Sequence, residues 1–241
     1  MRCLMWVPLL MGVLVMAGCE APESATWGEP QQTAASAPAP QNLFRSEEYR
    51  VELAYPENGV RRVDHTTGYF NNQGWRVDAG PDQPGRQLLI LQLDGSDDVT
   101  TGQLRLGVSR DPAQVRDCTQ PGNAAADRRG DPVFLGGVPF VTFQEGDAGM
   151  SHYQNVHAYR AVRDGTCYAI DLVVQGTNPQ VYDPPRTPPF SQQQGFERLR
   201  RLLSGFAFSD ARSGALNDAR NGHPPAAPGT RPRTAPAETA E

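Results

Sequence analysis

Apolar and polar side chains alternate along much of the middle of the chain, with the two-residue period of a half-buried β-strand. Asp164-Gly165 separates two such runs and is a strong signal for a tight hairpin turn. A nearly continuous apolar run followed by an alternating run predicts a second hairpin, and Gly136-Gly137 divides two shorter strands. The predicted strands lie at 49–55, 87–94 and 103–109, within 132–145, and at 153–162 and 166–175.

Two segments follow a helical pattern instead. Ser191 is a suitable N-cap for a helix that reaches about Leu203, and a short strand containing Phe206 and Phe208 follows it. The helix carries one apolar stripe, with its arginines largely opposite: Phe196, Leu199, Leu202 and Leu203. Asp111-Pro112 begins a shorter helix, because proline in the first turn loses no hydrogen bond. We therefore predict an α+β domain, with a mainly antiparallel sheet and the C-terminal helix packed on one face.

The start of the chain has the three parts of a secretory signal: Met1-Arg2, an apolar run, and small residues before Cys19. Residues 16–19 resemble the lipobox of bacterial lipoproteins, which implies cleavage before Cys19 and modification of that cysteine with diacylglycerol, with palmitate among the acyl chains. By the same resemblance, Glu20 favours the outer membrane, with the domain facing the periplasm. A soluble secreted protein and an uncleaved membrane anchor are the alternatives.

Composition divides the chain into four parts. Residues 1–18 form the predicted signal peptide, and 19–42 form the lipidated cysteine with a flexible tether rich in Ala, Pro, Ser and Gln. Residues 43–209 form the globular domain, and 210–241 repeat the tether's composition as a disordered tail. The net charge of −5 provides no basic field, so nucleic-acid binding is not expected.

Cys118 and Cys167 are the two thiols left once the signal is removed and Cys19 is lipidated. In an oxidising cell envelope they are expected to form one disulfide. Closing a loop of about 50 residues removes roughly 4 kcal/mol of unfolded-state entropy in the chain-entropy treatment. A redox-active pair is the alternative, although such pairs usually have the closer Cys-x-x-Cys spacing.

The order of the predicted elements is similar to that of PsbP/Mog1-like domains. The resemblance rests on a first strand ending in Tyr55-Pro56, the central hairpins, and a final helix that runs into residues 204–208. Members of that family serve mainly as accessory or binding proteins, so the resemblance implies an α+β domain that binds another molecule. No functional residue is transferred from it.

Candidate chemistry is sparse. His152 and His157 are the one close pair of histidines, but five residues on one strand place their rings on opposite faces, so no metal site is expected. Known hydrolase and nucleotide-binding signatures do not occur, and we predict neither catalytic residues nor a cofactor. Asp171 could join either histidine in an unrecognised enzyme site. An enzyme is therefore the less favoured hypothesis.

The proline-rich loop at 178–189 carries Tyr182 and is followed by Phe190. These two aromatic residues are the candidates for binding a partner, and the alternative is that the loop simply covers the sheet. The overall expectation is a membrane-anchored envelope lipoprotein whose domain, without enzymatic activity, binds another envelope protein or component. Small-ligand binding, and a hydrolase or metal-dependent enzyme, remain the alternatives.

Overall fold

The computed structural model describes residues 40–70, 73–121 and 129–209. The predicted signal peptide, Cys19, most of the predicted tether and the C-terminal tail lie outside these residues. Strand β1 begins at Gln41, so it includes the last two residues of the segment predicted as tether. Within the described residues, no helix reaches the length and hydrophobicity that a membrane span requires.

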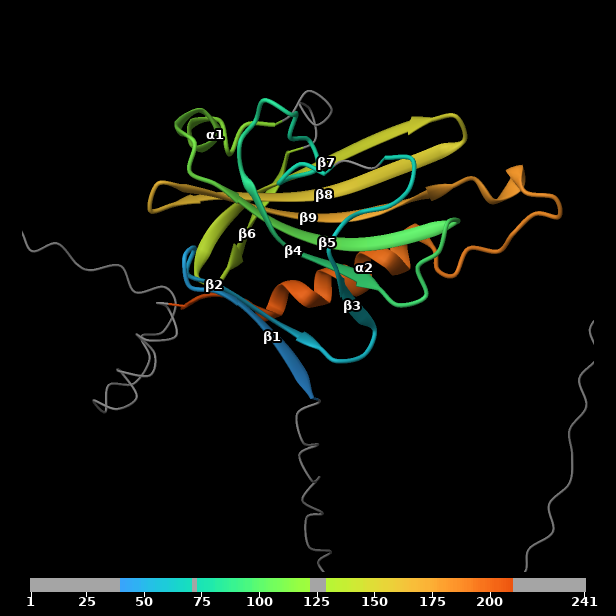
Figure 1. Cartoon of the computed structure of the whole chain (residues 1–241), viewed down its shortest axis with the longest axis horizontal. Helices are drawn as coiled ribbons and strands as arrows, with labels where there is room; N and C mark the ends of the chain where they lie inside the picture. The colour runs from blue at the N-terminus through green and yellow to red at the C-terminus, as the bar shows by residue number, and fades with distance from the viewer. Residues whose placement is uncertain (1–39, 71–72, 122–128, 210–241) are drawn as a thin grey trace, which may run out of the picture. The chain divides into compact units, whose positions relative to one another are not determined.

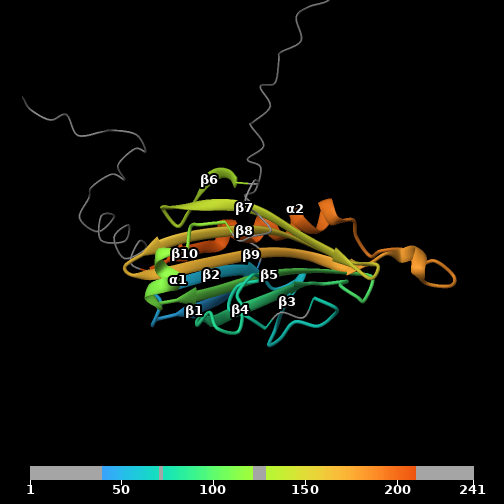
Figure 2. The ribbon, with the colours of Figure 1, turned by 90° about the horizontal axis from the view of Figure 1, so that it is seen from above.

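The main sheet has seven strands, and every neighbouring pair is antiparallel (Figure 1). Its long central strands run side by side when the molecule is seen from above (Figure 2). In spatial order the strands are β3 (Val60–Val63), β4 (Arg86–Leu93), β5 (Thr100–Ser109), β9 (Thr166–Thr177), β8 (His152–Arg163), β7 (Val138–Gly149) and β6 (Arg129–Leu135).

A second sheet has three strands, with β2 between β1 and β10. The remaining strands and helices are β1 (Gln41–Ser46), β2 (Val51–Pro56), β10 (Phe206–Phe208), α1 (Pro112–Arg116), α2 (Gln192–Leu202) and the 3-10 turns η1 (Pro179–Val181) and η2 (Leu203–Gly205). Because β10 follows α2 through η2, the end of the chain's described part returns to pair with its beginning. The small sheet and α2 therefore share the main core with one face of the large sheet.

Helix α2 forms where its capping residues and apolar stripe predict it. The Ser191 hydroxyl accepts from the Gln194 backbone while the Gln194 side chain accepts from the Ser191 backbone, which completes a capping box. The helix lies against β4, β5 and β9 and buries Phe196, Leu199 and Leu202. Burial of such side chains contributes about 1.5–3 kcal/mol each, so the stripe explains the docking of the helix.

The opposite face of the large sheet, which we call the outer face, is covered by α1 and by residues 64–70 and 73–85, which we call the cover. The cover approaches the sheet closely at Gly107, where an added Cβ would lie 1.7 Å from the backbone oxygen of Trp75. The Trp75 side chain is itself buried and shares a small apolar cluster with the cysteines and Ala79. Both faces of the sheet are therefore buried along its centre.

The predicted α+β class is wrong, and the protein is mainly β. The hairpins of β4 with β5 and of β8 with β9 are confirmed, as are α1, α2 and β10. The strands, however, are longer than their alternating patterns: β7, β8 and β9 each have twelve residues, whereas α2 has eleven and α1 five. Backbone pairing extends each strand past its apolar positions, so the sheets dominate and the helices add only a small part.

Candidate functional site

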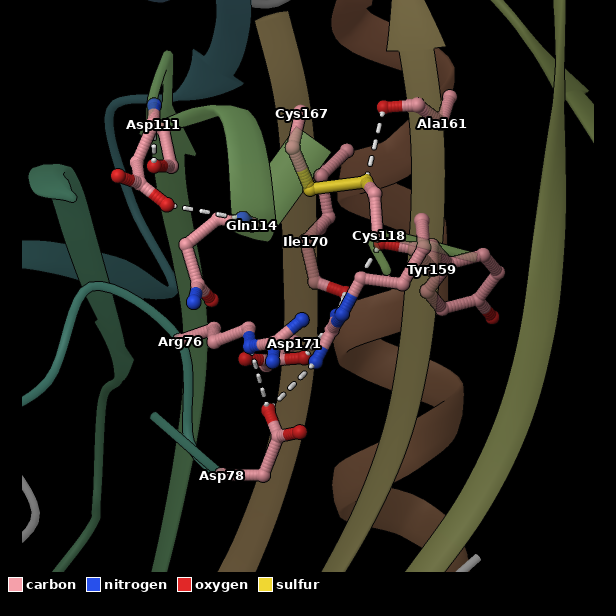
Figure 3. Close-up of a disulfide and its surroundings, with 12 residues drawn as sticks. Arg76, Asp78, Asp111, Gln114, Cys118, Tyr159, Ala161, Cys167, Ile170 and Asp171 are labelled. Carbon is pink, nitrogen blue, oxygen red and sulfur yellow. Dashed lines mark hydrogen bonds and ion pairs between the residues drawn. A yellow bond between two sulfur atoms is a disulfide. The ribbon is translucent and has the colours of Figure 1, made fainter. Parts of the chain in front are cut away.

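The predicted disulfide between Cys118 and Cys167 is confirmed (Figure 3). Both cysteines are fully buried, and their Cα atoms lie 5.7 Å apart. The bond attaches Cys118, two residues after the end of α1, to the start of β9, in one apolar cluster with Trp75 and Ala79. It therefore fixes α1 to the outer face of the sheet, a structural position that leaves the sulfur atoms enclosed.

A cluster of charged side chains lies beside the disulfide on the same face (Figure 3). Arg160 and Asp171 are both buried, and an Arg160 Nη1 donates to an Asp171 oxygen at 2.5 Å. The other guanidinium nitrogen of Arg160 lies 3.3 Å from Asp78, which also pairs with Arg76 at 3.1 Å. A buried pair of this kind is tolerated only when the remaining polar atoms also have partners.

The cover supplies such partners to Asp171 and to the neighbouring Arg105. The second oxygen of Asp171 accepts the backbone N–H of Val77 at 2.8 Å, and Arg105 donates to the carbonyl of Gly74 at 2.7 Å. Burial, and after it repulsion from Asp78, raises the pKa of Glu145 to about 7. The charged cluster thus holds residues 74–78 on the sheet, and the carboxylates of Asp78 and Asp171 are engaged in ion pairs.

A different arrangement occupies the end of the sheet where β4, β7 and β9 finish. Loops and turns that are distant in the sequence meet there. The backbone N–H of Asn178 bonds to the carbonyl of Ser151 at 2.8 Å, and the Tyr182 hydroxyl bonds to Asp98 at 3.2 Å. We call this region the loop end; it comprises residues 67–70, 94–99, 147–152 and 178–189.

The loop end contains a pocket of about 250 Å³. Four aromatic rings line it together with one carboxylate and several small polar groups. Its lining residues are Thr67, Gly68, Tyr69, Phe70, Asp98, Thr101, His152, Gln175, Gly176, Thr177 and Tyr182. Compared with models of known protein families and with curated proteins, the chain matches none. The resemblances to lipoproteins and to PsbP/Mog1-like domains therefore stay predictions.

The two histidines lie on opposite faces of β8, as their spacing predicts. His152 stacks on Tyr69, with ring centroids 4.3 Å apart, and its Nδ1 lies 3.0 Å from the Thr177 hydroxyl. His157 stacks on Phe196 of α2 at 3.9 Å, and burial, with a smaller effect of Arg200, lowers its pKa. No group of three metal-binding side chains occurs in the described part of the chain.

Acidic side chains surround the rim of the pocket. Arg186 pairs with Asp98 at 2.6 Å and with Asp97 at 3.4 Å, and its guanidinium lies 4.8 Å from the centre of the Tyr182 ring. The hydrogen bond from Arg186 lowers the pKa of Asp98, so this carboxylate stays ionised at neutral pH. The Asp98 side chain is nevertheless 64% exposed and can be reached from solvent.

The two aromatic residues that the sequence singles out have different surroundings. Phe190 is buried in the main core, beneath α2, where it packs near Gly102 and Gly195. Tyr182 is only partly buried and forms one wall of the loop-end pocket. The loop therefore covers the sheet through Phe190 and contributes to a surface through Tyr182.

Three apolar side chains of the loop end face solvent. Tyr69 is 56% exposed, Met150 is 81% exposed and Val181 is 52% exposed. Met150 and Ser151 form the tip of the β7–β8 hairpin and both have positive φ, at 51° and 66°. Such backbone is costly for residues other than glycine, and strain of this kind is common at functional sites. Sequence analysis missed Tyr69 and Met150, since neither belongs to an alternating run.

Proposed function

We propose that this protein is a lipoprotein of the cell envelope, anchored through Cys19, whose domain binds another envelope protein through its loop end. The anchor is supported by the charged, apolar and small-residue parts of the signal and by the cysteine that follows them. Several acyl chains on one cysteine make such anchoring stable, because each buried methylene contributes about 0.8 kcal/mol. The loop end is the part of the domain to which we assign the contact.

The observation that carries the proposal is that Tyr69, which lines the pocket, is exposed together with Met150 and Val181, which stand close in sequence to lining residues. Single exposed apolar residues are ordinary on protein surfaces, but a group of them rimmed by polar residues is typical of an interaction site. The pocket, at about 250 Å³, is smaller than the ~300–1,000 Å³ of most small-molecule sites. A protein surface that inserts one side chain fits it better than a whole small ligand.

A site-specific crosslinking experiment tests the binding surface. A photo-crosslinking amino acid is placed at position 150 of the full-length protein in its native envelope, and the matched control carries it at position 162. Val162 is also exposed and apolar, but it lies at the opposite end of β8 from the loop end. We expect a discrete adduct from position 150 and none from position 162. No adduct at 150, or equal adducts at both positions, would contradict the proposal.

The anchor is tested separately with Cys19→Ala. We expect this variant to leave the membrane fraction and to lose incorporation of labelled palmitate, while Cys118→Ala keeps both. Retention of label or of membrane association by Cys19→Ala would contradict lipidation at this residue. The two experiments are independent, because one reads membrane attachment and the other reads contact at the loop end.

A further inference from the structure

We propose that the loop-end pocket receives a cationic side chain of the binding partner, namely an arginine guanidinium. The inference deepens the proposed function and rests on it for the place of contact. It adds the chemistry of recognition: aromatic faces and an ionised carboxylate that together select a planar positive group.

Several aromatic rings line the pocket. Tyr69 stacks nearly parallel on His152, with an angle of 9° between the rings, and meets Phe70 edge to face at 5.0 Å. Tyr182 lines the same pocket from the segment after β9. The faces of tyrosine and phenylalanine rings attract cations, and several rings around one cavity are a known arrangement for binding positively charged groups.

Most of the charged side chains at the loop end are acidic. Asp98 lines the pocket, Asp97 is next to it, and Asp147 and Asp183 are exposed on the surrounding strand end and loop. Arg186 is the one arginine within residues 67–70, 94–99, 147–152 and 178–189. The loop end is therefore acidic overall, and charge complementarity favours a basic partner surface.

One guanidinium of the protein itself, that of Arg186, already lies at the loop end. Arg186 lies over the Tyr182 ring and donates to Asp98 at 2.6 Å, which is the combination of ring and carboxylate that the proposal requires. Arg186 uses oxygen Oδ2 of Asp98, and the Asp98 side chain remains largely exposed. A second guanidinium can enter from the side of Tyr69, whose ring is more than half exposed.

The volume of the pocket favours a single side chain over a larger ligand. A cavity of about 250 Å³ accommodates a guanidinium with part of its aliphatic stem. The stem would then lie against apolar surface of the loop end, where Met150 and Val181 are exposed, since long basic side chains cover apolar surface with their methylene groups. Arginine is preferred to lysine because its planar group both stacks on rings and forms paired hydrogen bonds with a carboxylate.

The test is a ligand-observed NMR titration of the full-length protein in detergent micelles, with N-acetylarginine amide and its neutral isostere N-acetylcitrulline amide as probes. We expect the arginine derivative to bind at least about tenfold more tightly, because the two probes differ chiefly in charge. We expect Tyr69→Ala and Asp98→Asn each to weaken its binding about 2- to 30-fold. Phe134→Ala and Asp164→Asn, which remove an exposed ring and an exposed carboxylate elsewhere, are the matched controls.

Equal binding of the two probes, or binding that the controls weaken as much as the pocket variants, would overturn the inference. Tighter binding of tetramethylammonium than of the arginine derivative would also overturn it, and would indicate a choline-type lipid headgroup. Crosslinking at position 150 separates this failure from failure of the proposed function. An adduct that persists unchanged in Tyr69→Ala and Asp98→Asn contradicts the guanidinium while leaving the binding surface intact.

Discussion

Charged side chains are buried on the outer face of the sheet, whereas apolar side chains are exposed at the loop end. On the outer face, Arg160 and Asp171 are enclosed and bonded to each other and to the cover segment. At the loop end, Tyr69 and Met150 have large exposed surfaces. The first region bonds its buried charges internally, and the second is the surface through which we propose that the domain contacts another molecule. A departure from ordinary burial therefore has to be interpreted with its surroundings: bonded partners indicate a structural role, and solvent exposure supports the proposed binding role.

The largest effect is expected from breaking the buried pair. Arg160→Leu leaves Asp171 without its main partner in a buried site, and we expect a loss of about 3–5 kcal/mol in the free energy of unfolding. Chemical denaturation measures it. The control is Asp164→Asn, which removes the exposed pair between Asp164 and Arg50 and should cost less than about 1 kcal/mol. Similar losses in the two variants would contradict the distinction between the buried and the exposed pair.

Close contact between the cover and the sheet gives the second prediction. Gly107→Ala places a methyl group against the backbone of Trp75, and we expect it to destabilise the protein by about 1–3 kcal/mol, as overpacking does. Gly80→Ala is the control, because an added Cβ there meets nothing within 4 Å. A Gly107→Ala variant with an unchanged melting temperature would show that residues 73–85 are not held tightly on the sheet.

Glu145 makes the outer face sensitive to pH. Between about pH 4.5 and 7 its carboxyl is ionised in the unfolded chain and protonated in the folded one, so raising the pH favours unfolding. This group's contribution is a fall in the free energy of unfolding of up to about 1.4 kcal/mol per pH unit across that range. Glu145→Gln should remove the fall, whereas Asp147→Asn, on the exposed part of the same strand, should keep it. Denaturation at pH 5, 6, 7 and 8 measures the slopes, and equal slopes in the wild type and Glu145→Gln would refute the assignment.

Local signals were sufficient to predict the hairpins, the disulfide and the capping of α2. They failed for the outer face, since Arg160 and Asp171 occupy the polar positions of alternating strands, a pattern that normally faces solvent. What buries them is the cover, residues 64–70 and 73–85, which has no hydrophobic period of its own. The predicted fold class failed for a related reason: edge strands such as β1 and β3 depend on pairing with a neighbour rather than on an apolar pattern.

The candidate site was predicted only in part. Tyr182 was singled out by its position in a proline-rich loop, but the pocket beside it is built from segments that lie far apart in the sequence. Tyr69 and His152 meet only because β8, β9 and the cover segment come together at one end of the sheet. Phe190, singled out with Tyr182, is a core residue, and its aromatic character could not distinguish the two environments.

The smallest effects on stability are expected at the loop end. Tyr182→Ala removes a surface ring and one hydrogen bond to Asp98. We expect the free energy of unfolding to change by no more than about 0.5–1 kcal/mol. The crosslinked adduct from position 150 should nevertheless weaken, because the pocket loses one wall. A large fall in melting temperature with an unchanged adduct would assign Tyr182 to the fold and not to the surface.

The central claim is that the loop end is a binding surface, and one measurement tests it most directly. The photo-crosslinking amino acid is placed at position 181 in the native envelope, with and without Met150→Glu, and the adduct yield is compared with the melting temperature of each purified protein. We predict that Met150→Glu lowers the yield at least about fivefold, as loss of a contact residue does, while the melting temperature stays the same. An unchanged yield, or a loss that matches a fall in melting temperature, would contradict the claim.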